Sequence, residues 1–143
     1  MPTLDNHGSS KAKARSRSTV AQLTNLQNLI AYTFKDIGLL RQAITHKSYS
    51  KTNNERLEFM GDAVLGYLVG TMLYRLYPHV QEDSLSLMRA QLVRGKTLAK
   101  VALQLKLPEH LLLGVGELRS GGQQRASILA DALEAVILSL IHI

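Results

Sequence analysis

Three carboxylates recur at helical spacing within one short run of the chain, NERLEFMGDAVL at residues 54–65. Glu55, Glu58 and Asp62 are separated by three and four positions, so a helix would place them along one face. Like charges in that arrangement repel one another, and a partly buried carboxylate without a partner is costly. A bound divalent cation would resolve both problems, so the run predicts a metal site.

A second acidic pair, Asp131 and Glu134, lies near the end of the chain at a spacing of three. Both acidic groups interrupt apolar stripes, since Leu65 and Val69 continue the first face and Leu138 continues the second. Two helices that faced each other would enclose a pocket of four carboxylates, whose hard oxygens suit Mg²⁺ or Mn²⁺ better than zinc. The competing interpretation is that each pair is solvated surface, and spacing alone leaves both open.

The elements that must position these acids are predicted to be helices. Apolar spacing predicts a helix over residues 20–34, and Asp36 predicts the N-cap of a second one. Residues 54–77 are apolar around most of a helical circumference and predict a long central helix that is ended by Pro78.

The second half of the chain follows the same pattern. Asp83 predicts the N-cap of a helix that is interrupted at Gly95 and that ends at Leu107, before a proline. The glycine-rich residues 114–122 predict a loop, and a last helix is expected to begin at position 124 or 125. No segment alternates with the period of a strand, so the expected fold class is all-α.

Composition narrows the class of protein. The 143 residues are 45% apolar, enough for one domain with its own core, which we assign to 20–143. There is no cysteine, which excludes disulfides and thiolate zinc sites. No apolar run reaches the roughly 20 residues that a membrane span needs, and residues 1–19 have no signal-peptide core. We expect a cytoplasmic protein with no membrane association and a disordered basic tail at 1–19.

The net charge of +6 favours an anionic partner such as nucleic acid. Five of the eleven acidic residues nevertheless fall into the two clusters described above. A basic chain that concentrates its carboxylates in two places suggests a metal site surrounded by a polyanion-binding surface.

The run at 54–65 resembles the signature of the ribonuclease III endonucleases, which cleave double-stranded RNA. The resemblance extends to THKS at 45–48, MRA at 88–90, LVR at 92–94 and SILADALEA at 127–135. It covers about residues 22–137 and is closest to bacterial enzymes that have a single catalytic domain.

The resemblance implies a role for each acid of the two clusters. Glu58, Asp131 and Glu134 would coordinate Mg²⁺ directly, with Mn²⁺ as a substitute, and Asp62 would act through a water molecule. Asp62 and Glu134 would be the residues most important for catalysis.

Three other positions match the family in supporting roles. Glu55 and Glu82 correspond to acidic positions in or near the catalytic valley. Phe59 corresponds to an aromatic residue that packs into the partner subunit of a homodimer, although ordinary core packing is the simpler interpretation. In the matching THKS segment, His46 is expected to be structural, and Lys47 is either a phosphate contact or a solvated surface residue.

The implied function is Mg²⁺-dependent cleavage of double-stranded RNA in rRNA and mRNA processing, leaving 5′-phosphate and 3′-hydroxyl ends. A homodimer would place one site on each strand. The alternatives are a catalytically weak RNA-binding or ribosome-associated module with the same fold, and an acid-lined bundle that binds metal for another purpose. The resemblance stops after Ile137, so we expect a truncated C-terminus without the family's double-stranded-RNA-binding domain.

Overall fold

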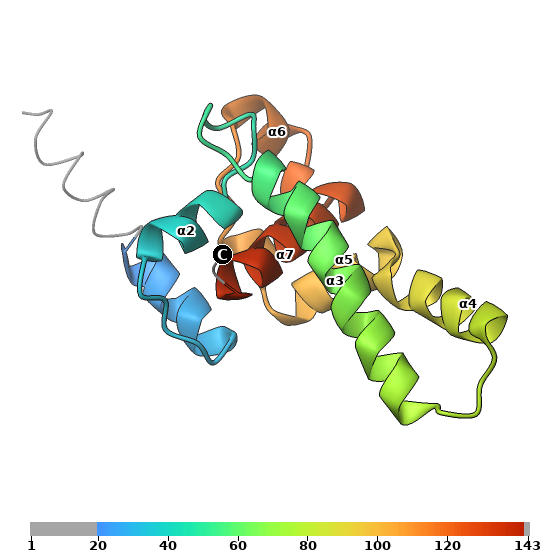
Figure 1. The fold of residues 1–143 in the computed structure, drawn as a ribbon. Helices are drawn as coiled ribbons and strands as arrows, with labels where there is room; N and C mark the ends of the chain where they lie inside the picture. Colours follow the sequence, from blue (N-terminus) through green and yellow to red (C-terminus); the bar gives the residue numbers. More distant parts are fainter. Residues whose placement is uncertain (1–19, 142–143) are drawn as a thin grey trace, which may run out of the picture.

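The computed structural model describes residues 20–141, in which all regular secondary structure is helical (Figure 1). After a helical stretch at 20–29, the order is α2 (Ile37–Ala43), α3 (Glu55–Leu76), α4 (Glu82–Val93), α5 (Gly95–Gln104), η1 (Leu107–Glu109), α6 (Val115–Arg119), η2 (Gly122–Gln124) and α7 (Ala126–Ile141). The predicted all-α class is therefore confirmed. The tail predicted at 1–19 lies outside the described residues. None of the described helices is long and apolar enough to cross a membrane.

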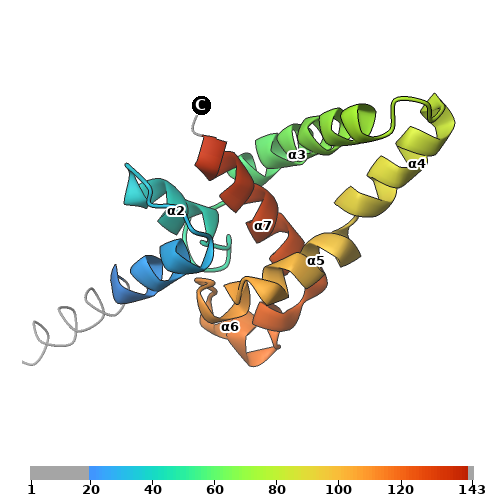
Figure 2. The ribbon, with the colours of Figure 1, turned by 90° about the horizontal axis from the view of Figure 1, so that it is seen from below.

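The centre of the core is α7, against which α2, α3 and α5 pack (Figures 1 and 2). Its sequence is apolar around almost its whole circumference, so the helix requires neighbours on several sides. The largest fully buried side chains come from different parts of the chain and include Leu26, Leu40, Leu107, Leu129 and Val136. Because α7 is held on several sides, the acidic side chains that it carries have a defined position.

The crossing of α3 over α7 is unusually close at Gly61, which is buried. A Cβ added to Gly61 would overlap the backbone carbonyl group of Glu134, and it would lie 3.3 Å from the Cα atom of that residue. Only glycine lets the two backbones approach to this extent. The crossing brings the first turns of α3 against the middle of α7.

Beyond this crossing, α3 and α4 extend away from the α7 core as an arm, which is clearest in Figure 2. Only Gly61 and Leu73 are buried on α3, and no residue of α4 is buried. The exposed large apolar side chains of these two helices are Phe59, Met60, Tyr67, Leu68, Met72, Tyr74, Leu76, Leu87 and Leu92. The long helix that the sequence predicted is present, but much of its apolar circumference is uncovered in the single chain.

Two predicted helix starts have different outcomes. Asp36 caps α2 as predicted, because its Oδ1 atom accepts a hydrogen bond of 2.9 Å from the backbone N–H of Gly38. The prediction that Asp83 is an N-cap is wrong, since Gln81 occupies that position and Asp83 lies in the first turn of α4. Acidic residues are favoured both at the cap and in the first turn, so residue type alone did not separate the two positions.

Other boundaries differ from the prediction for local backbone reasons. The first helix ends at residue 29 instead of 34, near Ala31, whose φ is 55°. The break at Gly95 is present, but α5 ends before Lys106, whose φ is 56°, and not at Leu107. The predicted loop at 114–122 contains the short helix α6, so that prediction was wrong there.

Substitution of Gly61 by alanine tests the α3–α7 crossing. The added methyl group must push the two helices apart, and overpacking of this kind costs about 1–3 kcal/mol. Alanine gains about 1 kcal/mol of helix propensity, so the net change in the free energy of unfolding should be a loss. Urea unfolding followed by circular dichroism measures it.

The matched control is Gly66→Ala in the same helix, where an added Cβ meets nothing within 4 Å. This variant should be stabilised by the propensity term alone. If Gly61→Ala were stabilised to the same extent, the close crossing would not exist in solution.

Candidate metal centre

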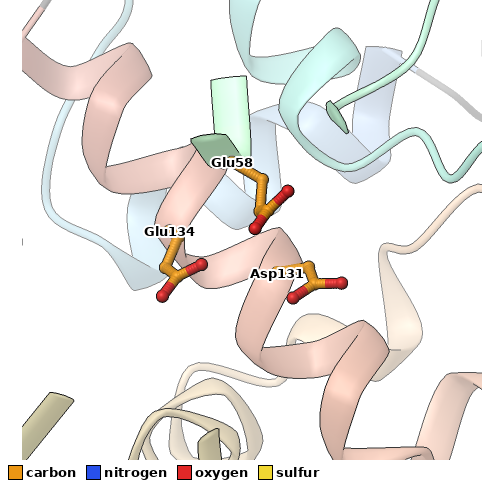
Figure 3. Close-up of side chains that lie close together, drawn as sticks. All are labelled: Glu58, Asp131 and Glu134. Carbon is orange, nitrogen blue, oxygen red and sulfur yellow. The ribbon is translucent and has the colours of Figure 1, made fainter. Parts of the chain in front are cut away.

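Glu58 of α3 and Asp131 and Glu134 of α7 lie together where the two helices cross (Figure 3). One carboxylate oxygen from each residue lies within 4.8 Å of the other two. Opposite ligands of a Mg²⁺ ion are separated by about 4 Å, so small side-chain rotations bring these oxygens into range. The structure thus places three of the predicted metal ligands in one group.

The electrostatics of the group are those of like charges forced together. Burial, and after it the nearby carboxylates of Asp62, Glu58 and Asp131, together raise the pKa of Glu134 to about 7. The pKa of Glu58 is also raised, first by burial and then by Asp131, Asp62 and Glu55. Asp62 is exposed but acts on both Glu58 and Glu134, so it belongs to the same acidic cluster.

These residues fit a hard divalent cation. Among residues 20–141, none of the four clustered acids forms an ion pair with a lysine or arginine. Glu134 is buried at 7% exposure, a position where an unpaired carboxylate is costly. An all-carboxylate set of oxygens is the donor set that Mg²⁺ and Mn²⁺ prefer.

The two acids predicted to have supporting roles lie in different places. Glu55 is at the edge of the cluster, where its Oε1 atom lies 3.3 Å from the Nζ atom of Lys47. Glu82 begins α4, accepts a 2.7 Å hydrogen bond from the hydroxyl of Ser86, and lines a hollow of about 410 Å³ together with Gly66 and other α3–α4 residues. Within the single chain, Glu82 therefore belongs to the arm and is not part of the three-carboxylate group.

Two residues that position the cluster were not identified from the sequence. One is Gly61, for which the available signal was a glycine in the interior of a helix. The other is Asn54, a buried side chain whose amide donates a 3.1 Å hydrogen bond to the carbonyl of Ala43. The backbone N–H of Asn54 donates to Thr45, so the start of α3 is tied to the end of α2. Nothing in the local sequence indicated this tie.

The fold and the site together define the class of protein. It is a small helical domain that holds a cluster of carboxylates between two crossing helices. Residues 36–142 match the family model described as ribonuclease-III-like. The chain is 54% identical over 115 residues to ribonuclease 3 of Nitrosococcus oceani, and 55% identical over 115 residues to that of Actinobacillus succinogenes. These alignments cover 80% of the chain and 49% and 51% of the two relatives.

A solved structure shows the same fold. The nuclease domain of ribonuclease III from Campylobacter jejuni superimposes with a TM-score of 0.79 and 47% identity, covering 81% of this chain and 82% of that domain. The chain therefore belongs to the ribonuclease III family and corresponds to its nuclease domain. It spans about half the length of the curated relatives that it matches.

The raised pKa of Glu134 predicts how stability depends on pH in the absence of divalent ions. Between about 4.5 and about 7, Glu134 keeps its proton in the folded state but has lost it in the unfolded state. The folded state then binds more protons, so the stabilisation present below pH 4.5 is lost as the pH rises through 7. Urea unfolding in EDTA across this window should show the decline.

Glu134→Gln removes this titration and should make the decline shallower, with the raised pKa values of Glu58 and Asp131 accounting for what remains, and the variant should be more stable than the unaltered protein above pH 7. Glu109→Gln, an exposed change in η1, is the control and should leave the slope unaltered. A full decline in Glu134→Gln would show that Glu134 does not carry the raised pKa.

Proposed function

We propose that this protein is a Mg²⁺-dependent endoribonuclease that cleaves double-stranded RNA, leaving 5′-phosphate and 3′-hydroxyl ends. The observation that carries the proposal is the convergence of Glu58, Asp131 and Glu134 at the α3–α7 crossing of a ribonuclease III nuclease domain. The proposed setting is rRNA and mRNA processing in the cytoplasm.

The chain's own residues supply the ion-binding part of the chemistry. Glu58, Asp131 and Glu134 would hold Mg²⁺, and Mn²⁺ would fit the same oxygens. When bound, such an ion activates water and neutralises the charge that develops on a phosphodiester during hydrolysis. Asp62 is exposed and acts on the pKa of the buried Glu134, which supports a role for its carboxylate in orienting a water molecule that enters from solvent. We assign the main catalytic roles to Asp62 and Glu134.

A polyanion such as duplex RNA is the class of substrate that the net charge favours. The chain carries a net charge of +6 although five of its eleven acidic residues lie in the two acidic clusters, so basic residues outnumber acidic ones in the rest of the chain. A basic surface around an acidic cation site is suited to a polyanion whose phosphodiester must reach the cation. An RNA duplex would be bound through its backbone and 2′-hydroxyl groups, because side chains cannot read its narrow major groove.

A homodimer is the assembly that the uncovered arm favours. Phe59 is 73% exposed on α3, so the simpler interpretation, core packing within the chain, was wrong. It belongs to the exposed apolar residues of α3 and α4, which are numerous enough to mark an interface. The Campylobacter jejuni nuclease domain has a region involved in dimer formation. Two copies would supply one site for each RNA strand, and Glu82 would take its supporting role in that assembly.

The purified protein should cleave duplex RNA in Mg²⁺ and lose this activity in EDTA. Glu134→Gln keeps the shape of the side chain but removes its charge, so cleavage should fall by at least about a hundredfold. A gel assay with end-labelled duplex measures the rate, and products whose new 5′ ends accept a phosphate from polynucleotide kinase only after phosphatase treatment identify the 5′-phosphate.

Glu109→Gln is the control for charge removal and should cleave at the unaltered rate. Activity that persists in EDTA or in Glu134→Gln would contradict the metal mechanism. Binding of duplex RNA without cleavage under all conditions would favour the RNA-binding module.

Phe59→Glu should weaken self-association, because it places a charge in the apolar surface that the proposed dimer buries. Sedimentation velocity over a concentration series measures the dissociation constant, which should rise at least about tenfold, the effect of losing about 1.4 kcal/mol. Val115→Glu on α6 is also a substitution of an exposed apolar residue, at 65% exposure, and should leave the constant unchanged. If Phe59→Glu and Val115→Glu had the same dissociation constant, this interface would be wrong.

A further inference from the structure

The turn at residues 45–48 lies beside the acidic cluster and is held there by the segment before α6. A parallel bridge pairs Thr45 with Leu112, and the backbone N–H of His46 donates to the Leu112 carbonyl at 2.9 Å. The N–H of Gly114 donates to the Ser48 hydroxyl at 2.9 Å, and a Cβ at Gly114 would overlap the carbonyl of Ser48. The turn is therefore hydrogen-bonded to the segment at residues 112–114, which fixes its position.

His46 and Ser48, the residues on either side of Lys47, are also hydrogen-bonded to each other. The Nδ1 atom of His46 accepts from the backbone N–H of Ser48 at 3.1 Å and lies 2.7 Å from its hydroxyl oxygen. The polar atoms of His46 and Ser48 that face the turn are used in holding its shape. Lys47 is left as the residue of the turn whose charge faces outward, with its side chain 64% exposed.

The Lys47 ammonium group lies next to two acids of the site region. Its Nζ atom is 3.3 Å from Glu55, and the rise that burial causes in the pKa of Asp131 is opposed first by His46 and then by Lys47. Both members of the Lys47–Glu55 pair are more than half exposed, and pairs of this kind contribute little net stability. The pair is therefore easily exchanged for a stronger one.

We propose that Lys47 binds and positions a phosphate group of the substrate backbone at the edge of the acidic cluster, and that Glu55 holds its ammonium group there until the phosphate arrives. The inference rests on the proposed function, since it takes duplex RNA as the substrate. A phosphodiester backbone carries a dense negative charge, for which lysine is a suitable point-charge partner. The fixed turn limits where Lys47 can reach, so the phosphate that it binds is set relative to Glu58 and Asp131.

Steady-state cleavage of duplex RNA in Mg²⁺ tests the inference on the full chain. Lys47→Gln should raise KM several-fold with little change in kcat, and its log(kcat/KM) should fall less steeply with log salt, by about one unit of slope. Lys47→Arg keeps the charge and should restore most of the affinity. The control is Lys35→Gln, which removes an exposed charge from the segment before α2 and should alter neither value.

A binding measurement without metal tests the role of Glu55 independently of cleavage. In EDTA, Glu55→Gln releases the Lys47 ammonium, so fluorescence anisotropy should show tighter binding of labelled duplex RNA. The gain should disappear in the Glu55→Gln, Lys47→Gln double variant. If Glu55→Gln increased the affinity for duplex RNA equally with and without Lys47, Glu55 would act only through overall charge. The proposed exchange of Glu55 for a phosphate as the partner of Lys47 would then be wrong.

The two proposals fail in different ways. If the unaltered protein cleaves RNA but Lys47→Gln behaves as Lys35→Gln does, the role of Lys47 is wrong and the proposed function stands. If the unaltered protein does not cleave, the proposed function is wrong, and the anisotropy cycle alone decides whether Lys47 contacts the duplex.

Discussion

The backbone contact between α3 and α7 at Gly61 is the constraint on which the acidic centre depends. It brings Glu58 against Glu134 more closely than two helices with side chains at the crossing would allow. The resulting repulsion and burial are visible in the raised pKa values of both residues. The apolar packing around α7 must supply the free energy that holds these acids together. The cluster thus destabilises the folded state, and packing in the rest of the fold offsets this effect.

The distribution of apolar side chains divides the molecule into two parts with different requirements. Around α7 the chain completes its own core, whereas α3 and α4 leave large apolar side chains such as Phe59 and Tyr74 in contact with solvent. An arm that cannot bury its own apolar surface is expected to obtain cover from another chain. The site lies at the base of this arm, since Glu58 and Phe59 are consecutive residues of α3. The proposed dimer interface and the acidic cluster therefore both depend on α3.

The acids of the site were predictable because helical spacing is a local property. The positions of Glu58 and Asp62, and of Asp131 and Glu134, followed from intervals of three and four residues. That the two pairs face each other was not predictable from spacing, because it depends on the crossing at Gly61. The exposure of the arm was missed for a related reason, since an apolar helical pattern does not specify which chain covers it. Helix boundaries failed where one residue, such as Lys106, adopts a left-handed conformation.

The proposed RNA substrate is negatively charged and would have to approach a site that is itself negative, and two features of the structure reduce this repulsion. One is the set of carboxylates, whose negative charge can be reduced by a bound cation or, by one unit, by a proton on Glu134. The other is the turn that fixes Lys47 beside Glu55 and Asp131. A proton and a cation compete for the same carboxylate oxygens, but only the cation leaves Glu134 ionised. A cation held by Glu58, Asp131 and Glu134 would therefore lower the repulsion within the cluster and could offer a phosphate oxygen a positive partner, with Lys47 near its edge.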